Sequence, residues 1–151
     1  MLSVWWGVRG IVYWELIPNN KTVTAMVYCA QLDKLKAELE AKHRGQQKVY
    51  FLHENAQPHV ALSTRQKLMQ FGWDVLPHPP NSPDLAPTDY HLFLSLSNKQ
   101  RDECFENQDD LKAFLANFFN SHPPEFYKRG IHSLATRWQS VIDNKGAYIT
   151  K

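Results

Sequence analysis

Two acidic residues stand where carboxylates could bind a metal ion. Glu54 follows the apolar run from Val49 to Leu52, and Asp89 follows a proline-rich connection. Ligands of open α/β sheets gather beyond the carboxyl ends of strands, and Mg²⁺ prefers oxygen ligands. Two such ions about 4 Å apart can activate a hydroxyl and stabilise the leaving oxygen of a phosphodiester. Glu54 and Asp89 therefore predict part of a Mg²⁺ site.

Structural roles compete with this interpretation at each acid. An acid in the first turn of a helix is stabilised by the helix dipole by roughly 0.3 to 1 kcal/mol, which would explain Asp89 without a metal. Glu54 could equally be a loop acid at a strand end. Asp84 lies in the same connection as Asp89, and its position is more typical of a turn than of a metal ligand.

Histidine and tryptophan side chains suggest two further chemistries, both of which we disfavour. A zinc hydrolase motif places two histidines four residues apart on one helical face, whereas His53 and His59 are six apart with a proline between them. Packing in a sheet, rather than stacking on nucleic-acid bases, is the simpler role for three tryptophans in β-rich segments. They are Trp5, Trp6 and Trp14.

Basic residues form two loose groups along the chain. The first holds Lys42, His43, Arg44 and Lys48, and the second holds Lys128, Arg129, His132 and Arg137. Solvated helix faces are the simplest interpretation, and contacts to phosphates are the alternative. The formal net charge of +2 neither requires nor excludes a polyanionic partner.

The elements that must position the two acids are read from hydrophobic periodicity. β-rich runs on either side of Arg9-Gly10 predict an antiparallel hairpin, and helical spacing predicts two helices that end at Gly45 and Gly72. Between them, Val49 to Leu52 has the continuous apolar character of a strand covered on both faces. The predicted strands are 2–8, 11–17, 49–52 and 73–76, and the predicted helices are 24–43 and 60–71. Strand 49–52, helix 60–71 and strand 73–76 form a β-α-β unit.

Three more helices are predicted after the connection from Pro77 to Pro87, whose five prolines make it stiff and extended. Thr88 can cap a helix that starts at Asp89. Two apolar stripes predict buried helix faces. They are Leu111, Phe114, Leu115, Phe118 and Phe119, and then Ile131, Leu134, Ala135, Trp138, Val141 and Ile142.

Composition limits the class of protein. The 151 residues are 43% hydrophobic and 13% aromatic, which is enough to build one packed domain or a large part of one. Cys29 and Cys104 are too few for a disulfide framework, so we expect free thiols in a reducing compartment. No apolar run approaches the roughly 20 residues that span a bilayer, and no signal peptide is recognisable. We expect a soluble intracellular protein without a membrane partner.

Several motifs together resemble the mariner family of transposases, which also occurs fused to a methyltransferase in SETMAR proteins. They are Met-Leu-Ser-Val-Trp-Trp at 1–6, Leu-His-Glu-Asn-Ala at 52–56, Pro-His at 58–59, Val-Leu-Pro-His at 75–78, Ser-Pro-Asp-Leu-Ala-Pro-Thr-Asp-Tyr-His-Leu-Phe at 82–93 and Phe-Tyr-Lys-Arg-Gly-Ile-His at 126–132. The resemblance covers nearly the whole chain. It implies a ribonuclease H-like catalytic domain that cleaves and joins DNA strands with Mg²⁺.

The resemblance implies three catalytic aspartates, of which the second and third are separated by thirty-four residues. Positions 55 to 88 are the thirty-four residues between Glu54 and Asp89. Asp89 therefore matches the third acid, and Glu54 stands where the family has aspartate. The extra methylene moves the carboxylate by roughly 1.5 Å, and a misplacement of about 1 Å can cost on the order of a hundredfold in rate. Residual metal binding is compatible with Glu54, but efficient two-metal chemistry is not expected.

The resemblance also implies a first aspartate, on a central strand that precedes the Trp5-Trp6 segment. It implies helix-turn-helix DNA-binding domains before that strand. Residues 1–151 contain no counterpart of either. We therefore expect an α/β fold that is a truncated ribonuclease H-like mixed sheet flanked by helices. In the implied strand order 3-2-1-4-5, strand 1 is missing, which leaves inner strand edges open to pairing with other chains.

The predicted function is that of a mariner-type transposase fragment, ancestrally a Mg²⁺-dependent enzyme of DNA strand cleavage and joining, here an inactive pseudoenzyme. The resemblance implies transposon-end DNA as partner, a nuclear location, and pairing with a second copy or with an intact transposase. One alternative is a non-catalytic DNA-binding or dimerisation module of transposase origin. Another is a degenerate product of the element without selected function.

Overall fold

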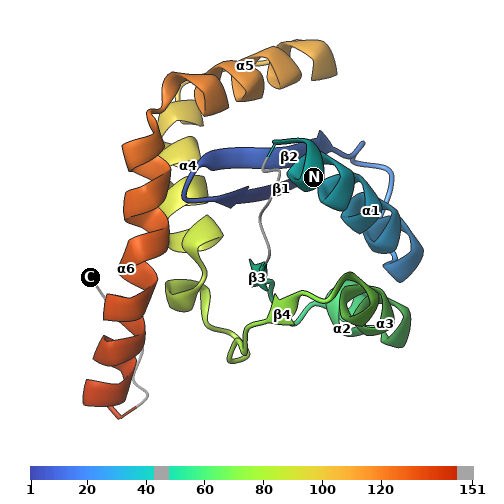
Figure 1. Cartoon of the computed structure of the whole chain (residues 1–151). Helices are drawn as coiled ribbons and strands as arrows, with labels where there is room; N and C mark the ends of the chain where they lie inside the picture. The colour runs from blue at the N-terminus through green and yellow to red at the C-terminus, as the bar shows by residue number, and fades with distance from the viewer. Residues whose placement is uncertain (43–47, 146–151) are drawn as a thin grey trace. The chain divides into compact units, whose positions relative to one another are not determined.

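The computed structural model describes residues 1–42 and 48–145 of the chain (Figure 1). Its elements are β1 (Leu2–Gly7), β2 (Gly10–Leu16), α1 (Ala25–Lys42), β3 (Tyr50–Phe51), α2 (Gln57–Val60), α3 (Leu62–Phe71), β4 (Asp74–Val75), the 3-10 turn η1 (Pro83–Leu85), the π-helical turn η2 (Thr88–Phe93), α4 (Leu94–Gln100), α5 (Gln108–Ser121) and α6 (Pro124–Asp143). None of the described helices is long and apolar enough to cross a membrane.

The chain divides into two compact units. The first, here the N-terminal unit, comprises Met1–Trp5 and Val12–Asn81. The second, the C-terminal unit, comprises Trp6–Ile11 and Ser82–Lys151. The β1–β2 hairpin contributes to both, because its turn groups with the C-terminal unit and its open end with the N-terminal one.

The hairpin is confirmed, with its turn one residue earlier than predicted. Met1 and Ile17 exchange backbone hydrogen bonds of 2.7 and 2.9 Å at the open end. The turn is Val8-Arg9, because Gly10 already begins β2. Gly10 has a φ of +117°, a conformation that glycine adopts without steric cost.

β3 and β4 form the predicted parallel pair on either side of α2 and α3, with Tyr50 opposite Asp74 and Phe51 opposite Val75. The expectation that the first of these strands is covered on both faces is wrong. Phe51 is buried at 6% exposure, but Tyr50 is 63% exposed, since only one face of the pair packs on the core. Within the described residues, the hairpin and the β3–β4 pair are separate two-stranded sheets.

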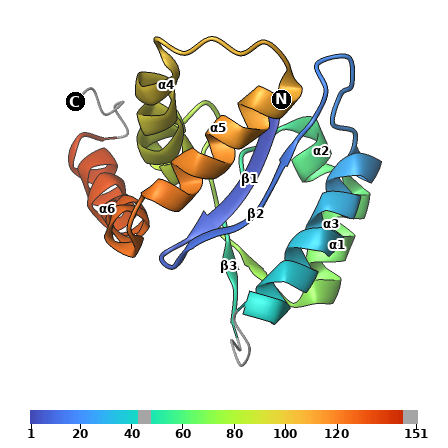
Figure 2. The same ribbon diagram turned by 90° about the horizontal axis from the view of Figure 1, so that it is seen from above.

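The helix predicted from Thr24 is α1, and it packs on α2 and α3 (Figure 2). The Thr24 hydroxyl accepts a hydrogen bond from Val27 N at 3.2 Å, which satisfies one of the free amides of the first turn. The buried face of α1 joins residues of both sheets and of α3 in one core cluster. Its buried members are Val12, Tyr28, Leu32, Leu35, Phe51 and Leu68. The predicted end of this helix at Gly45 lies outside the described residues.

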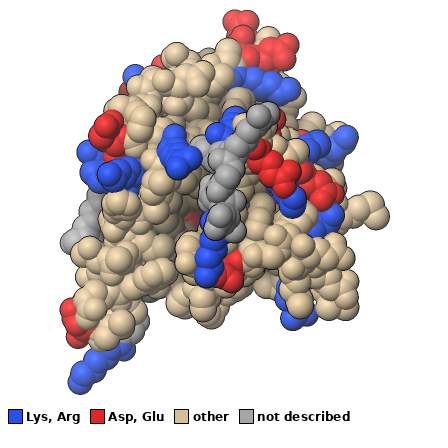
Figure 3. Space-filling view, in the orientation of Figure 1, with Lys and Arg blue, Asp and Glu red and all other residues tan. Residues whose placement is uncertain are grey.

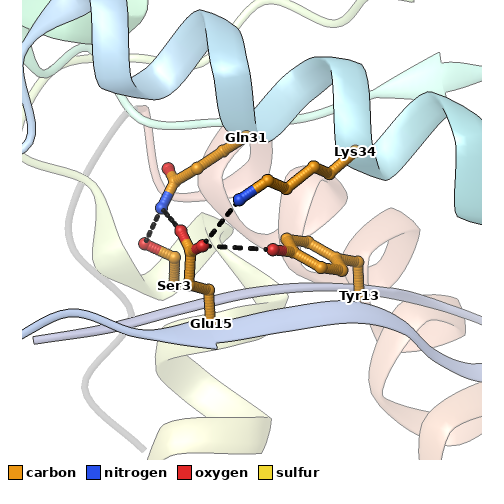
Figure 4. A network of polar contacts seen from close by, with 5 residues as sticks. All are labelled: Ser3, Tyr13, Glu15, Gln31 and Lys34. Carbon is orange, nitrogen blue, oxygen red and sulfur yellow. Dashed lines mark hydrogen bonds and ion pairs between the residues drawn. The ribbon is translucent and has the colours of Figure 1, made fainter.

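A polar network also attaches α1 to the hairpin (Figure 4). Gln31, only 1% exposed, donates through Nε2 to Glu15 Oε2 at 2.6 Å and to Ser3 Oγ at 3.3 Å. Lys34 and Tyr13 each donate to Glu15 Oε1 at 3.2 Å. Burial raises the pKa of Glu15, but the hydrogen bonds from Gln31 and Lys34 outweigh this and lower it. Glu15 therefore stays ionised as the common acceptor.

The second predicted helix is interrupted at Ala61, whose extended backbone (φ −58°, ψ 149°) separates α2 from α3. Its predicted end is confirmed. Gly72 adopts the left-handed conformation with a φ of 72°, and its N–H closes the last turn on the carbonyls of Leu68 and Met69. The two cysteines are free, as expected.

The C-terminal unit contains the predicted helices after the proline-rich connection. Asn107 caps α5 because its side-chain oxygen accepts from Asp110 N at 2.9 Å. The buried residues of α5 and α6 are Leu115, Phe118, Phe119, Phe126, Tyr127, Gly130 and Leu134. The prediction that Trp138 and Ile142 are core residues is wrong, because α6 continues past Leu134, its last buried residue. Trp138 and Ile142 are 36% and 69% exposed.

The unpaired sheet edges lead to a prediction about association. Within the described residues, each sheet has only two strands, so each strand has one edge without a ladder partner, and such edges can pair with another chain. We expect the purified 151-residue polypeptide to associate as its concentration rises, which light scattering after size-exclusion chromatography would detect. A monodisperse monomer with one sharp calorimetric transition would contradict this.

Candidate functional site

Glu54 lies in the N-terminal unit, exposed in the loop from β3 to α2. Asn55 Nδ2 donates to the carbonyl oxygen of His78 at 2.8 Å, and this bond joins the loop to the segment that follows β4. The loops after the two parallel strands are therefore connected directly at their carboxyl ends. This is the placement predicted for Glu54 from the apolar run before it.

Three aromatic rings pack together beside Glu54. The rings of His53 and His59 are parallel to within 1° with centroids 5.0 Å apart, and the Tyr28 ring lies 4.2 Å from His59. The Tyr28 hydroxyl is 2.8 Å from His53 Nδ1. His59 Nδ1 is 2.8 Å from the carbonyl oxygen of Glu54. This cluster was not predicted, because the spacing of the two histidines was weighed only against that of zinc ligands.

Burial keeps the cluster uncharged at neutral pH. It lowers the pKa of His53 to about 4, with smaller contributions from His59 and His78. Burial also lowers the pKa of His59, although its bond to the Glu54 carbonyl acts in the opposite direction. Burial raises the pKa of Tyr28, so its hydroxyl stays protonated beside His53 Nδ1.

Asp89 lies in the C-terminal unit, half-buried in the first turn of η2. Its N–H bonds to the carbonyl of Ala86 at 2.9 Å, directly after the 3-10 turn that contains Asp84. Asp84 thus has the turn position that we expected. The capping role predicted for Thr88 is wrong, because η2 has no side-chain cap and the Thr88 hydroxyl accepts instead from Trp6 Nε1 at 3.0 Å.

Side-chain hydrogen bonds hold η2 against α6. His91 Nε2 is 2.7 Å from the carbonyl oxygen of Phe126, so this nitrogen carries the donated proton. Tyr90 donates to the carbonyl oxygen of Gly130 at 2.6 Å. Gly130 allows this close approach, since a Cβ on it would lie 2.3 Å from His91 Cδ2.

Arg137 of α6 fixes the turn before Asp89. Its guanidinium lies 3.9 Å above the centre of the Tyr90 ring, and Nη1 donates to the carbonyl oxygen of Asp84 at 3.1 Å. The segment around Asp89 is therefore attached to α6 by three hydrogen bonds.

Trp5 and Trp6 pack within the fold, as predicted. Trp5 belongs to the core of the N-terminal unit and stacks on Tyr13 at 5.8 Å. Trp6 contacts the rings of His91 and Tyr127 in the C-terminal unit.

The predicted basic groups have mixed structural roles. Lys42 Nζ donates to Val12 O at 2.7 Å, Lys48 pairs with Asp74 at 3.1 Å, and Arg137 is engaged as described. Lys128, Arg129 and His132 are exposed on α6. On the face seen in Figure 3, basic and acidic side chains are interspersed. His43 and Arg44 lie outside the described residues.

Glu54 and Asp89 belong to different units. Both offer carboxylate oxygens, the ligand type that Mg²⁺ prefers. Among residues 1–42 and 48–145, no three or more His, Cys, Asp or Glu side chains are grouped closely enough to hold a metal ion.

Comparison with known proteins identifies the family. Residues 1–49 match the family model described as Transposase (partial DDE domain). The chain is 40% identical over 153 residues to the mariner Mos1 transposase of Drosophila mauritiana, covering 99% of this chain and 44% of that protein. The solved Mos1 catalytic domain with Raltegravir and Mg matches it with a TM-score of 0.96 at 40% identity, covering 99% of this chain and 76% of that one. The chain belongs to the mariner family of transposases.

Two further relatives of this mariner chain extend the comparison. Histone-lysine N-methyltransferase SETMAR of Homo sapiens is 37% identical over 151 residues, covering 98% of this chain and 22% of that protein. A Mos1 paired-end complex with the left transposon end matches with a TM-score of 0.95 at 41% identity, covering 99% of this chain and 44% of that one. The chain thus spans less than half the length of the curated relatives that it matches. The predicted family and α/β class are confirmed.

The close contact at Gly130 predicts a strong effect of one added methyl group. Gly130→Ala should force His91 away from Phe126 and lower the free energy of unfolding by about 1–3 kcal/mol, as overpacking of a core does. Gly7→Ala is the matched control, because a Cβ there meets nothing within 4 Å. Urea unfolding of both variants measures the difference. Equal stability of the two would show that the contact is easily relieved.

The buried histidine predicts how stability depends on pH. The folded chain holds the pKa of His53 at about 4, below its ordinary value of 6.5, so the unfolded chain binds more protons between these values. The contribution of His53 to stability is therefore present above pH 6.5 and is lost as the pH falls towards 4. His53→Gln should flatten this part of the pH profile in urea unfolding. An unchanged profile in His53→Gln would contradict the assignment.

Proposed function

We propose that this chain is part of a mariner transposase catalytic domain, descended from a Mg²⁺-dependent enzyme of DNA strand cleavage and joining, and that Glu54 prevents efficient catalysis. The spacing of Glu54 and Asp89, within flanking residues that match the family motifs, carries the proposal. The 40% identity over nearly the whole chain supports it. So do solved structures of the related Mos1 catalytic domain with Mg and with Mn.

The fold proposed for this region is ribonuclease H-like. β1 and β2 would be strands 2 and 3 of that sheet, and β3 and β4 would be strands 4 and 5. The parallel pairing of β3 with β4 and the separate pairing of the hairpin support this assignment. The first strand and its aspartate would then come from a segment outside residues 1–151.

Glu54 and Asp89 would supply two of the three metal-binding carboxylates. Bound Mg²⁺ would activate the attacking hydroxyl and stabilise the leaving oxygen. Asp89 is well suited to a fixed position, since η2 is bound to α6 around it. The side chain of Glu54 is longer than that of aspartate by one methylene, so its carboxylate would be displaced from where aspartate would hold the metal.

The second candidate function is a non-catalytic DNA-binding or dimerisation module. The exposed basic residues of α6 favour it, since Lys128, Arg129 and His132 could contact phosphates without any metal. The related Mos1 transposase has been solved in a paired-end complex with a transposon end. For both candidates, DNA, a second copy or an intact transposase would be the partner, and the location would be the nucleus.

A chimaera provides the decisive comparison. Residues 1–151 would replace the corresponding region of the Mos1 transposase, which then supplies the first acid and the DNA-binding domains. We expect plasmid cleavage with Mg²⁺ to be slower with Glu54 than in the Glu54→Asp chimaera by on the order of a hundredfold. Asp89→Ala should abolish cleavage in both.

Two results would redirect the proposal. Equal cleavage rates with Glu54 and with Glu54→Asp would contradict impaired catalysis. If the 151-residue chain binds DNA with strong salt dependence, and charge-removing changes at Lys128 and Arg129 weaken this binding, the module would be favoured.

A further inference from the structure

The orientation of the His59 ring is fixed from two directions. Its ring packs against the rings of Tyr28 and His53, at centroid distances of 4.2 and 5.0 Å. Thr64, fully buried, donates its hydroxyl to the carbonyl oxygen of Pro58 at 2.6 Å and so holds the peptide that precedes His59. The imidazole nitrogens therefore have defined positions.

One of those nitrogens is bound to the backbone of Glu54. His59 Nδ1 lies 2.8 Å from the Glu54 carbonyl oxygen, and a carbonyl oxygen can only accept. The proton of neutral His59 must therefore be on Nδ1, which leaves Nε2 unprotonated.

Each hydrogen bond near Glu54 involves a different neighbouring residue. Tyr28 is bonded to His53 before it, and Asn55 after it is bonded to the carbonyl of His78. His59 is the partner of the Glu54 backbone itself. Because the Glu54 side chain is exposed, the position of its carboxylate is set by the position of the Glu54 backbone.

We propose that His59 is a positioning residue, which fixes the Glu54 peptide through its Nδ1–H and thereby sets where the Glu54 carboxylate can meet a metal ion. This inference rests on the proposed function, because it assigns Glu54 the role of a ligand. His59 itself is not assigned contact with metal or DNA.

A matched pair of variants isolates the hydrogen bond. Asparagine places an N–H donor close to where His59 has Nδ1, whereas leucine has nearly the same shape and no donor. Both His59→Asn and His59→Leu lose the aromatic ring, so the two differ chiefly in the bond to Glu54. Leu68→Ala, in the core cluster that also contains Tyr28, serves as a control for general loss of stability.

The first measurement requires no metal. We expect the ¹⁵N spectrum of the chain to show His59 as the Nδ1–H tautomer. We also expect the ¹³C signal of the Glu54 carbonyl to shift in His59→Leu, which has no donor for this oxygen, and to stay close to its original position in His59→Asn. An Nε2–H tautomer, or equal shifts in the two variants, would overturn the proposal.

The second measurement links the positioning to the metal. Mn²⁺ affinity, followed by electron paramagnetic resonance, should be weakened in His59→Leu by roughly fivefold, and should be retained in His59→Asn and Leu68→Ala. Equal weakening in all three would overturn a positioning role. If Mn²⁺ binding by the chain is insensitive to Glu54→Gln, the ligand role in the proposed function fails, and the Glu54 carbonyl signal still decides whether His59 fixes Glu54.

Discussion

The placement of both acids depends on hydrogen bonds from side chains to backbone carbonyls. The loop after β3 and the turns around Asp89 have no sheet ladder to hold them. His59 donates to Glu54 O, Tyr90 to Gly130 O and Arg137 to Asp84 O. Each bond joins a loop or turn to a neighbouring helical segment, so the position of the acid depends on the packing of that segment.

Local signals predicted the features whose physical cause lies within a few residues. Gly72 ends α3 through its own backbone conformation, and the apolar spacing of α1 predicts its buried face. The thirty-four residues between Glu54 and Asp89 are likewise visible without a structure. The sequence alone is sufficient to predict these features.

The predictions that failed concern residues whose contacts are made with a partner distant in the sequence. Thr88 does not cap η2, because its hydroxyl accepts from Trp6, eighty-two positions away. The ring cluster beside Glu54 requires Tyr28 of α1 to meet His53 and His59 after β3, and no local pattern indicates this. Trp138 fits the helical stripe of α6 but lies beyond its buried part. Such contacts depend on how the elements pack.

Because the chain belongs to the mariner family, we propose one common role for these local arrangements, which is to hold metal-binding carboxylates. In our account the chain retains the means of holding two acids, with Asp89 at its ancestral length and Glu54 too long. The most direct test is a titration of the ¹⁵N-labelled chain with Mn²⁺. We predict that the amide signals of Glu54 and Asp89 broaden together, before those of exposed acids such as Asp109. Broadening of Asp109 with Glu54 and Asp89 unaffected would contradict the account.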